Sequence, residues 1–227
     1  MDALITVSHG SRHPGAVGPV DELSAAAGRL AGLPSFSAHL EFNSPSLIEV
    51  ANAARAEGFQ HAWVVPLLFT HGYHARVDLP AEVAKASGDG LALELGDGIG
   101  TGEDLVEVLL RRPLPDAARI VLYSVGSSDA AANAEISNLA RRVAQRLGHE
   151  VDVLFATGGA TLADLAAAHR RIHVLPLFVT EGLLLDRLFS AAAELSARTV
   201  AEISIDNPLG VNLAPIVAGR VPARSFS

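Results

Sequence analysis

Cysteine is entirely absent from this chain of 227 residues. Its own side chains therefore cannot form disulfides, thiolate zinc sites or the usual ligand set of an iron–sulfur cluster. The absence is in keeping with the cytoplasm, which we take as the expected compartment. The N-terminus lacks a basic region followed by an apolar stretch and a small-residue cleavage site, so we expect no signal peptide.

Long apolar runs and an excess of positive charge are absent as well. The longest runs, such as "AWVVPLLF", fall far short of the roughly 20 residues that a membrane-spanning helix needs. The formal net charge of −8 argues against general binding to nucleic acid or to anionic membranes. Aromatic residues make up only 5%, whereas 49% are hydrophobic, which is ordinary for a soluble α/β enzyme. We expect a soluble protein of one large domain or two small ones.

Short apolar runs typical of strands alternate with helical stretches along the chain. This alternation predicts parallel sheets with helices on both faces. Ser44 suits the N-cap of one helix and Asp78 that of the next. The predicted strands are residues 3–8, 35–41, 61–69, 91–96, 119–124, 150–156, 172–180 and 199–204. The predicted helices are residues 20–32, 44–58, 76–86, 102–112, 129–148, 161–171, 182–195 and 208–221.

The two halves of the chain share sequence as well as pattern. The stretch "ITVSHGS" is matched by "VLYSVGS", and "VVPLLFTHG" is matched by "VLPLFVTEG" in the same order. The segment Arg111–Arg119 contains two prolines and is typical of a linker. The fold class we predict is α/β, with two tandem, similar βα-repeat domains of residues 1–114 and 115–227.

Polar side chains follow the first three predicted strands. His9 follows the first strand, Glu41 ends the second, and His71 and His74 follow the third. Ligands of open parallel sheets bind beyond the carboxyl ends of the strands, so we expect these side chains to share one crevice. Imidazole and carboxylate can hold Fe, Co, Ni or Zn, and imidazole also accepts protons near neutrality. The sequence does not decide on which face of its strand Glu41 lies.

The second half keeps the scaffold but not these residues. A histidine after a strand is often only a polar turn residue, yet a role required by the fold should persist in both repeats. Its loss predicts a single active site in the first domain, with the degenerate second domain forming the opposite wall of a cleft. The aligned positions are Val125 for His9, Glu181 for His71, Leu184 for His74, and Phe155 or Ala156 for Glu41.

Other polar residues have two interpretations. Arg12 and Arg76 are either surface residues or partners for substrate carboxylates, to which guanidinium geometry is suited. His13 is interpreted as a surface residue. The remaining histidines are expected to be structural or exposed, and these are His39, His61, His149, His169 and His173.

Three motifs in order carry a resemblance to a known family. "VSHGSR", "EFNSPS" and "PLLFTHGYHARVDLP" resemble the class II tetrapyrrole chelatases, and more narrowly the sirohydrochlorin chelatases of sirohaem and cobalamin biosynthesis. The resemblance covers the whole chain, because long members of the family have two tandem halves. The chain has "DLP" where "DIP" is usual, and "EFNSPS" lacks the acidic residue that often precedes the proline.

The resemblance implies a lyase that inserts a divalent metal into a metal-free tetrapyrrole and releases two protons. His9 and His74 would bind the metal, with Glu41 as third ligand or proton acceptor. The metal is a substrate, with Fe²⁺ favoured, Co²⁺ as the alternative for cobalamin and Ni²⁺ also conceivable; no organic cofactor is implied. The fused halves favour a monomer. Residues assigned to substrate binding are Ser11, Arg12, Ser44, His71 and Arg76.

Three rival functions stay open at the level of sequence. A histidine phosphatase also places a His-Gly pair after its first strand, but an arginine would precede that histidine, where this chain has Ser8. A two-lobed carrier of metal or tetrapyrrole would bind without turnover. A degenerate homologue of the chelatases would have only a structural role.

Overall fold

The computed structural model describes residues 1–70, 78–88, 90–116 and 118–222. These residues form two compact units. Unit 1 combines Met1–Gly100 with the C-terminal segment that begins at Gly210, and unit 2 is Thr101–Leu209. Each unit is an α/β structure built on one parallel sheet, as the alternating pattern predicts.

Unit 1 contains a four-stranded sheet in the order β2-β1-β3-β4. Its central strand β1 is buried on both faces, because nearly every residue from Ala3 to Ser8 is apolar or small. The strands are β1 (Asp2–Ser8), β2 (Ser35–His39), β3 (His61–Pro66) and β4 (Ala92–Leu95). The helices are α1 (Val17–Ala31), α2 (Leu47–Ala56), α3 (Leu79–Ala86) and α8 (Ala214–Gly219), with the 3₁₀ turn η2 (Gly210–Leu213) before α8.

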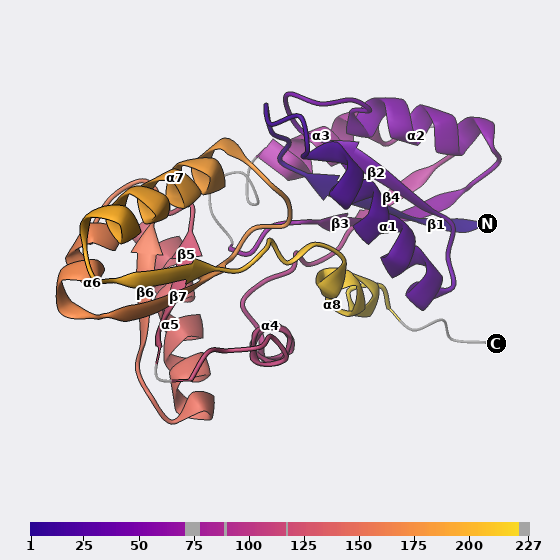
Figure 1. The fold of residues 1–227 in the computed structure, drawn as a ribbon. Helices are drawn as coiled ribbons and strands as arrows, with labels where there is room; N and C mark the ends of the chain where they lie inside the picture. The colour runs from indigo at the N-terminus through magenta and orange to yellow at the C-terminus, as the bar shows by residue number, and fades with distance from the viewer. Residues whose placement is uncertain (71–77, 89, 117, 223–227) are drawn as a thin grey trace. The chain divides into compact units, whose positions relative to one another are not determined.

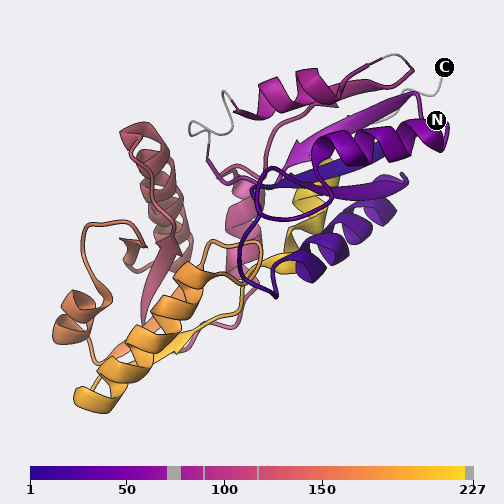
Figure 2. The same ribbon diagram turned by 90° about the horizontal axis from the view of Figure 1, so that it is seen from above.

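Helices cover both faces of this sheet (Figure 1). On one face α2 and α3 enclose a core with Ile5, Val7 and Val64. On the other face α1 packs beside α8, and Figure 2 shows the two helices side by side. Leu23, Leu213 and Val217, none more than 1% exposed, fill this second layer.

Unit 2 repeats the arrangement. Its sheet has the order β6-β5-β7-β8, and α6 and α7 enclose one core while α5 and α4 pack together. The strands are β5 (Arg119–Ser124), β6 (Val151–Phe155), β7 (Arg171–Pro176) and β8 (Glu202–Ile205). The helices are α4 (Glu103–Leu110), α5 (Ala130–Leu147), α6 (Leu162–Ala168) and α7 (Leu183–Arg198).

The compact units differ from the predicted domains 1–114 and 115–227 by an exchange of helices. Helix α4 ends the first sequence repeat but belongs to unit 2, and α8 ends the second repeat but belongs to unit 1. Helix α4 therefore completes unit 2 in place of α8, and α8 completes unit 1 in place of α4. A repeat in sequence reveals where a unit recurs, but not which copy of an apolar helix covers which sheet.

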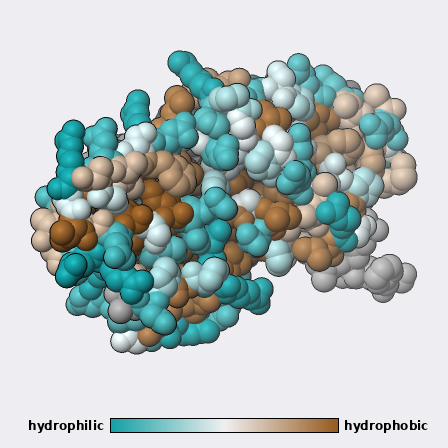
Figure 3. Space-filling view, in the orientation of Figure 1, coloured by the Kyte–Doolittle hydropathy of each residue, from teal (hydrophilic) through white to brown (hydrophobic). Residues whose placement is uncertain are grey.

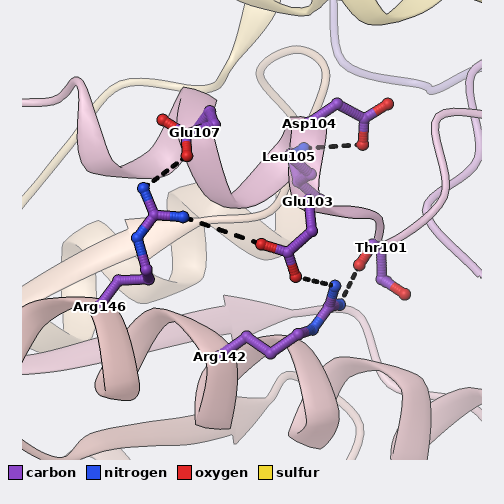
Figure 4. Close-up of polar contacts among 7 residues, drawn as sticks. All are labelled: Thr101, Glu103, Asp104, Leu105, Glu107, Arg142 and Arg146. Carbon is purple, nitrogen blue, oxygen red and sulfur yellow. Dashed lines mark hydrogen bonds and ion pairs between the residues drawn. The ribbon is translucent and has the colours of Figure 1, made fainter.

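Ionic and hydrogen-bonded contacts fasten α4 within unit 2 (Figure 4). Glu103 and Glu107 of α4 pair with Arg142 and Arg146 of α5, at 2.9 and 2.6 Å. Arg142 also donates to the carbonyl of Thr101. These pairs are partly exposed, so each adds only about 0.2–1 kcal/mol. They set the position of α4 on α5 while apolar packing provides the stability.

The ends of both exchanged helices carry an arginine that bonds to the loop after the last strand of their unit. Arg112, just after α4, pairs with Asp206 at 2.6 Å, and the side chains are 14% and 20% exposed. Arg220, just after α8, donates to the carbonyls of Gly98 and Ile99 at 2.8 and 2.6 Å. Desolvated guanidinium contacts of this kind fix a helix end more firmly than surface pairs do.

The start of helix α2 lies elsewhere than predicted, whereas that of α3 does not. Helix α2 begins at Leu47, and its N-cap is Ser46, whose side chain forms a capping box with Glu49; Ser44 lies two residues earlier, before a cis peptide bond to Pro45. Ser46 is the N-cap rather than Ser44 because Glu49 lies three residues after Ser46, the spacing that a capping box requires. Asp78 occupies the predicted N-cap position of α3.

Exposed apolar side chains are scattered through both units. On the face in Figure 3, brown hydrophobic residues are interspersed with teal hydrophilic ones. Examples are Leu30, Phe42 and Leu183, which are 62%, 52% and 50% exposed. Within the described ranges, no helix is both long enough and apolar enough to cross a membrane.

Candidate functional site

The carboxyl end of β1 turns sharply at His9 and Gly10. Gly10 has a φ of +93°, and a Cβ placed there would lie 1.8 Å from the carbonyl oxygen of Glu41. Only glycine fits both the dihedral angle and this close approach. The turn therefore presses the backbone after β1 against the backbone after β2, and it carries His9 at its start.

Hydrogen bonds join the two loops at this edge of the sheet. The backbone N–H of Glu41 donates to the carbonyl of His9 at 2.9 Å, just beyond the last register pair of β1 and β2. The backbone N–H of Ser11 donates to Oδ1 of Asn43 at 2.8 Å. His9, Ser11 and Glu41 are thus held in adjoining loops. The sequence prediction overlooked Asn43, although the quoted "EFNSPS" contains it.

Arg12 and Phe42 extend this cluster. The guanidinium carbon of Arg12 lies 4.8 Å from the ring centroid of Phe42, over its face. The rings of His9 and Phe42 meet edge to face, with centroids 6.2 Å apart. His9 is half-buried, whereas Arg12, Glu41 and Phe42 are exposed. The described part of the site thus offers an imidazole, a carboxylate, a guanidinium and an aromatic ring at one sheet edge.

A buried pair lies beneath these loops. Ser8 and His39 are register partners on β1 and β2, and the Oγ of Ser8 is 2.7 Å from the Nδ1 of His39. His39 is only 2% exposed, and burial lowers its pKa against the opposing charge of Asp21. The histidine is therefore a buried strand-end residue, which agrees with its predicted structural role. It fixes the strand ends from which His9 and Glu41 emerge.

The structure corrects the alignment of Glu41 with the second repeat. The N–H of Glu41 bonds to the carbonyl of His9, and the N–H of Thr157 bonds to the carbonyl of Val125 in the same way. Thr157, not Phe155 or Ala156, is therefore the counterpart of Glu41. Register shows that Phe155 corresponds instead to His39, since it faces Ser124 as His39 faces Ser8. The sequence alignment failed because the loop lengths after these strands differ.

The counterpart edge of unit 2 lacks this set of ionisable groups. Val125 is 42% exposed at the position of His9, and the hydroxyl of Thr157 donates to the carbonyl of Val125 at 3.0 Å. Gly126 keeps a positive φ of +84°, like Gly10. The turn is therefore required by the scaffold in both units, while the imidazole and the carboxylate occur only in unit 1.

Three of the predicted site residues lie outside the described part of the chain, and these are His71, His74 and Arg76. Within the described ranges, no group of three or more His, Asp or Glu residues is placed to hold a metal ion. His9 and Glu41 share the site through their adjoining loops. Ser44 is exposed in the loop before α2, and Ser11 lies six residues before α1, so neither is at the first turn of a helix.

The remaining histidines have other surroundings. Nδ1 of His13 accepts from the N–H of Gly15 and shapes the loop before α1. His61 contacts Trp63 and Glu94 near the opposite end of β3. His173 is 4% exposed and bonds to Ser204, so it is structural. His149 is exposed, and its ring contacts a backbone carbonyl.

A pocket of about 360 Å³ lies along the free edge of β2, and it includes Pro45 of the loop after β2. Its lining combines serines of β2 with one carboxylate from each flanking helix. Asp21 bonds to Ser37, and Glu49 belongs to the capping box of α2. The lining residues are Asp21, Ser24, Ala25, Ser35, Phe36, Ser37, Pro45, Glu49, Val50 and Ala53.

Comparison with known families decides the relationship of this chain. The family model described as CbiX matches residues 3–114 and matches again over residues 119–221. The chain belongs to the CbiX family. The resemblance to class II chelatases drawn from the three motifs is thereby confirmed.

Curated relatives match this CbiX-family chain over most of its length. A sirohydrochlorin ferrochelatase of Priestia megaterium is 25% identical over an alignment of 240 residues, which covers 97% of the chain and 90% of the relative. A sirohydrochlorin cobaltochelatase of the same organism is 26% identical over 207 residues, or 83% of the chain and 67% of the relative. Relatives of both kinds are therefore similar to this chain at nearly equal identity.

Solved structures of the family have the same fold. The sirohydrochlorin chelatase SirB of Bacillus subtilis subspecies spizizenii in complex with cobalt superposes with a TM-score of 0.78, at 24% identity, over 97% of this CbiX-family chain and 93% of its own. CbiX, the terminal enzyme for biosynthesis of siroheme in denitrifying bacteria, gives a TM-score of 0.69 at 18% identity, over 96% and 97%. These likenesses confirm the predicted α/β fold.

Proposed function

We propose that this protein is a sirohydrochlorin chelatase, a lyase that inserts a divalent metal into a metal-free tetrapyrrole. The observation that carries the proposal is the family match of both halves, joined to the position of His9 and Glu41 at one strand edge. Relatives named as ferrochelatase and as cobaltochelatase support this reaction class.

The chemistry asks for a group that holds a metal weakly and a group that accepts protons. Metal insertion replaces two protons on the pyrrole nitrogens with one divalent ion, and no covalent bond to the protein is required. We assign His9 to holding the incoming ion in its neutral form. His74, which lies outside the described residues, is the proposed second ligand. Few protein ligands leave coordination positions open, so the ion can pass to the macrocycle.

Glu41 is the proposed third ligand or proton acceptor. Its exposed carboxylate stands in the loop that bonds to His9, so it can serve beside the ion without a further change of the backbone. A carboxylate near a transferred cation also offsets charge while two protons leave. The substitution Glu41→Gln keeps the shape of the side chain and removes its charge.

Substrate binding is assigned to residues around this pair. Sirohydrochlorin carries many carboxylates, and the guanidinium of Arg12 has the fork geometry that recognises them. Ser11 and Ser44 can donate hydrogen bonds from exposed or half-exposed loop positions. His71 and Arg76 are retained as proposed partners, although they lie outside the described residues. We expect the protein to act in the cytoplasm, as a monomer.

The types of ligand do not determine which metal is the substrate, so an assay must compare the metals. Imidazole and carboxylate suit Fe²⁺, Co²⁺ and Ni²⁺, and affinity alone would favour nickel over iron. We propose Fe²⁺ as the main substrate, with Co²⁺ as the alternative. Anaerobic insertion into purified sirohydrochlorin, followed by the change in absorption, compares the three metals directly. A carrier would bind the macrocycle with no catalysed change in spectrum.

A further inference from the structure

The backbone of Phe42 adopts a conformation that L-residues avoid. Its φ is +63°, and it is the only non-glycine residue with positive φ in the described part of the chain. A phenylalanine in the left-handed region is strained, since its Cβ approaches the backbone. The surrounding fold must hold this residue in place, and such outliers gather at functional sites.

The second repeat avoids the same strain. Gly158 follows Thr157, the counterpart of Glu41, and has a φ of +152°, which glycine adopts at little cost. The loop after the second strand of each repeat thus takes a positive φ at this point. Unit 2 has glycine at this point with a more extended φ, whereas unit 1 places an aromatic residue there in the left-handed region.

The ring of Phe42 does not serve the core. Phe42 is 52% exposed and is absent from the buried cluster beneath its loop. Its described ring contacts are with His9, edge to face at 6.2 Å, and with Arg12, whose guanidinium lies over the ring at 4.8 Å. The ring therefore sits between the proposed metal ligand and the proposed carboxylate partner.

We infer that Phe42 is a substrate-binding residue that receives the macrocycle beside His9. The exposed part of its ring provides an apolar contact for a flat, conjugated ligand. The same ring holds the guanidinium of Arg12 by a cation–π contact, so that the charge faces a peripheral carboxylate of that ligand. The class of ligand is a planar aromatic polycarboxylate, and this inference rests on the proposed chelatase function.

The test compares substitutions of Phe42 by Ala and by Gly with the wild type. Anaerobic fluorescence titration with metal-free sirohydrochlorin, without metal, gives the Kd. We expect Phe42→Ala and Phe42→Gly to raise the Kd about tenfold, the size of a lost aromatic contact. We also expect Phe42→Gly to leave the melting temperature unchanged or higher, because glycine relieves the strained φ. Loss of affinity together with retained stability separates a binding residue from a structural one.

A matched control is Phe189→Ala. Phe189 is 42% exposed on α7 of unit 2 and has no assigned role, so its loss tests the effect of removing any exposed phenylalanine. We expect its Kd to equal that of the wild type. If Phe42→Ala and Phe42→Gly also keep the wild-type Kd, the inference is overturned while the proposed function stands. If the wild type itself neither binds nor metallates sirohydrochlorin, the proposed function is overturned and this inference with it.

Discussion

Gly10 is the residue on which the geometry of the candidate site depends most directly. Its positive φ and its approach to the carbonyl of Glu41 leave no space for a side chain. Both candidate groups, His9 and Glu41, flank this point of contact. A side chain at Gly10 would push apart the two loops that hold them.

We predict that Gly10→Ala lowers both the rate of metal insertion and the stability of the fold. Strain at such a position costs about 1–3 kcal/mol, and the clash with the Glu41 carbonyl adds to it. Gly18→Ala is the matched control, because a Cβ at Gly18 meets no atom within 4 Å. Urea unfolding and the insertion assay are the measurements. Equal rates and equal midpoints for the two variants would contradict this account of the turn.

At the residue scale the sequence predicted some of the candidate site residues but not all of them. The contrast between repeats singled out His9, because the turn recurs as "YSVGSS" with valine in its place. Phe42 and Asn43 escaped notice, because a positive φ on a phenylalanine and a hydrogen bond between loops have no signature in a single sequence. Glu41 was aligned with the wrong partner for the same reason, since loop geometry and not residue type fixes that correspondence.

A partly buried polar network joins β7 and β8 in unit 2. His173 of β7 bonds through Nδ1 to Ser204 of β8, at 2.8 Å, and its Nε2 lies 3.7 Å from a carboxylate oxygen of Asp206. Asp206 in turn pairs with Arg112 after α4. Burial lowers the pKa of His173, and the charge of Arg112 lowers it further while Asp206 opposes both. The network therefore ties the exchanged helix to the sheet.

This network predicts a dependence of stability on pH. Because the folded-state pKa lies below the value of 6.5 for an exposed imidazole, the unfolded chain binds a proton more readily. The contribution of His173 to the free energy of unfolding is thus complete above about pH 6.5 and is lost as the pH falls through the folded-state pKa. The slope is at most about 1.4 kcal/mol per pH unit for one proton.

The test uses His173→Gln, which retains a polar side chain opposite Ser204. The difference between the urea midpoints at pH 7.5 and pH 5 should be smaller in the variant than in the wild type, because one of the histidines whose protonation is coupled to folding has been removed. His149→Ala, at an exposed histidine, should keep the full wild-type difference. An unchanged pH dependence in His173→Gln would refute the linkage.

At the element scale the alternating pattern predicted every strand and helix type, and the comparisons confirm the fold. The predicted ends of these elements were less accurate. Pro66 ends β3 three residues before the predicted boundary, and the capping box at Ser46 moves the start of α2. Hydrophobic period indicates which residues face a core, whereas the boundary depends on hydrogen bonds that compete locally.

The exchange of α4 and α8 makes each unit depend on both halves of the chain. Unit 1 is closed by α8, whose Ile216 and Val217 are buried, and unit 2 is closed by α4, whose Leu105 and Leu109 are buried. The sequence repeat does not reveal the exchange, because both helices have a similar apolar pattern. Removing either helix would expose an apolar face.

We predict that residues 1–114 and residues 115–227 do not fold separately into stable monomers. Fragment 1–114 would contain α4 but not the sheet of unit 2, and fragment 115–227 would contain α8 but not the sheet of unit 1. Co-expression of the two fragments should instead yield a complex, since each supplies the helix that the other lacks. Size-exclusion chromatography and far-UV circular dichroism of the single and combined fragments measure this. A monomeric, cooperatively unfolding fragment 1–114 would contradict the exchange.

The central claim is that the loops after β1 and β2 in unit 1 hold a metal ion and deliver it to a tetrapyrrole. The most direct test is anaerobic insertion of Fe²⁺, Co²⁺ and Ni²⁺ into sirohydrochlorin by the wild type, His9→Ala, Glu41→Gln and the control His149→Ala. We predict catalysed insertion by the wild type and the control, with a loss of about 100-fold or more in His9→Ala and a smaller loss in Glu41→Gln. An insertion rate in His9→Ala equal to that of the wild type would contradict the site assignment, and a wild-type rate no faster than the uncatalysed reaction would contradict the function.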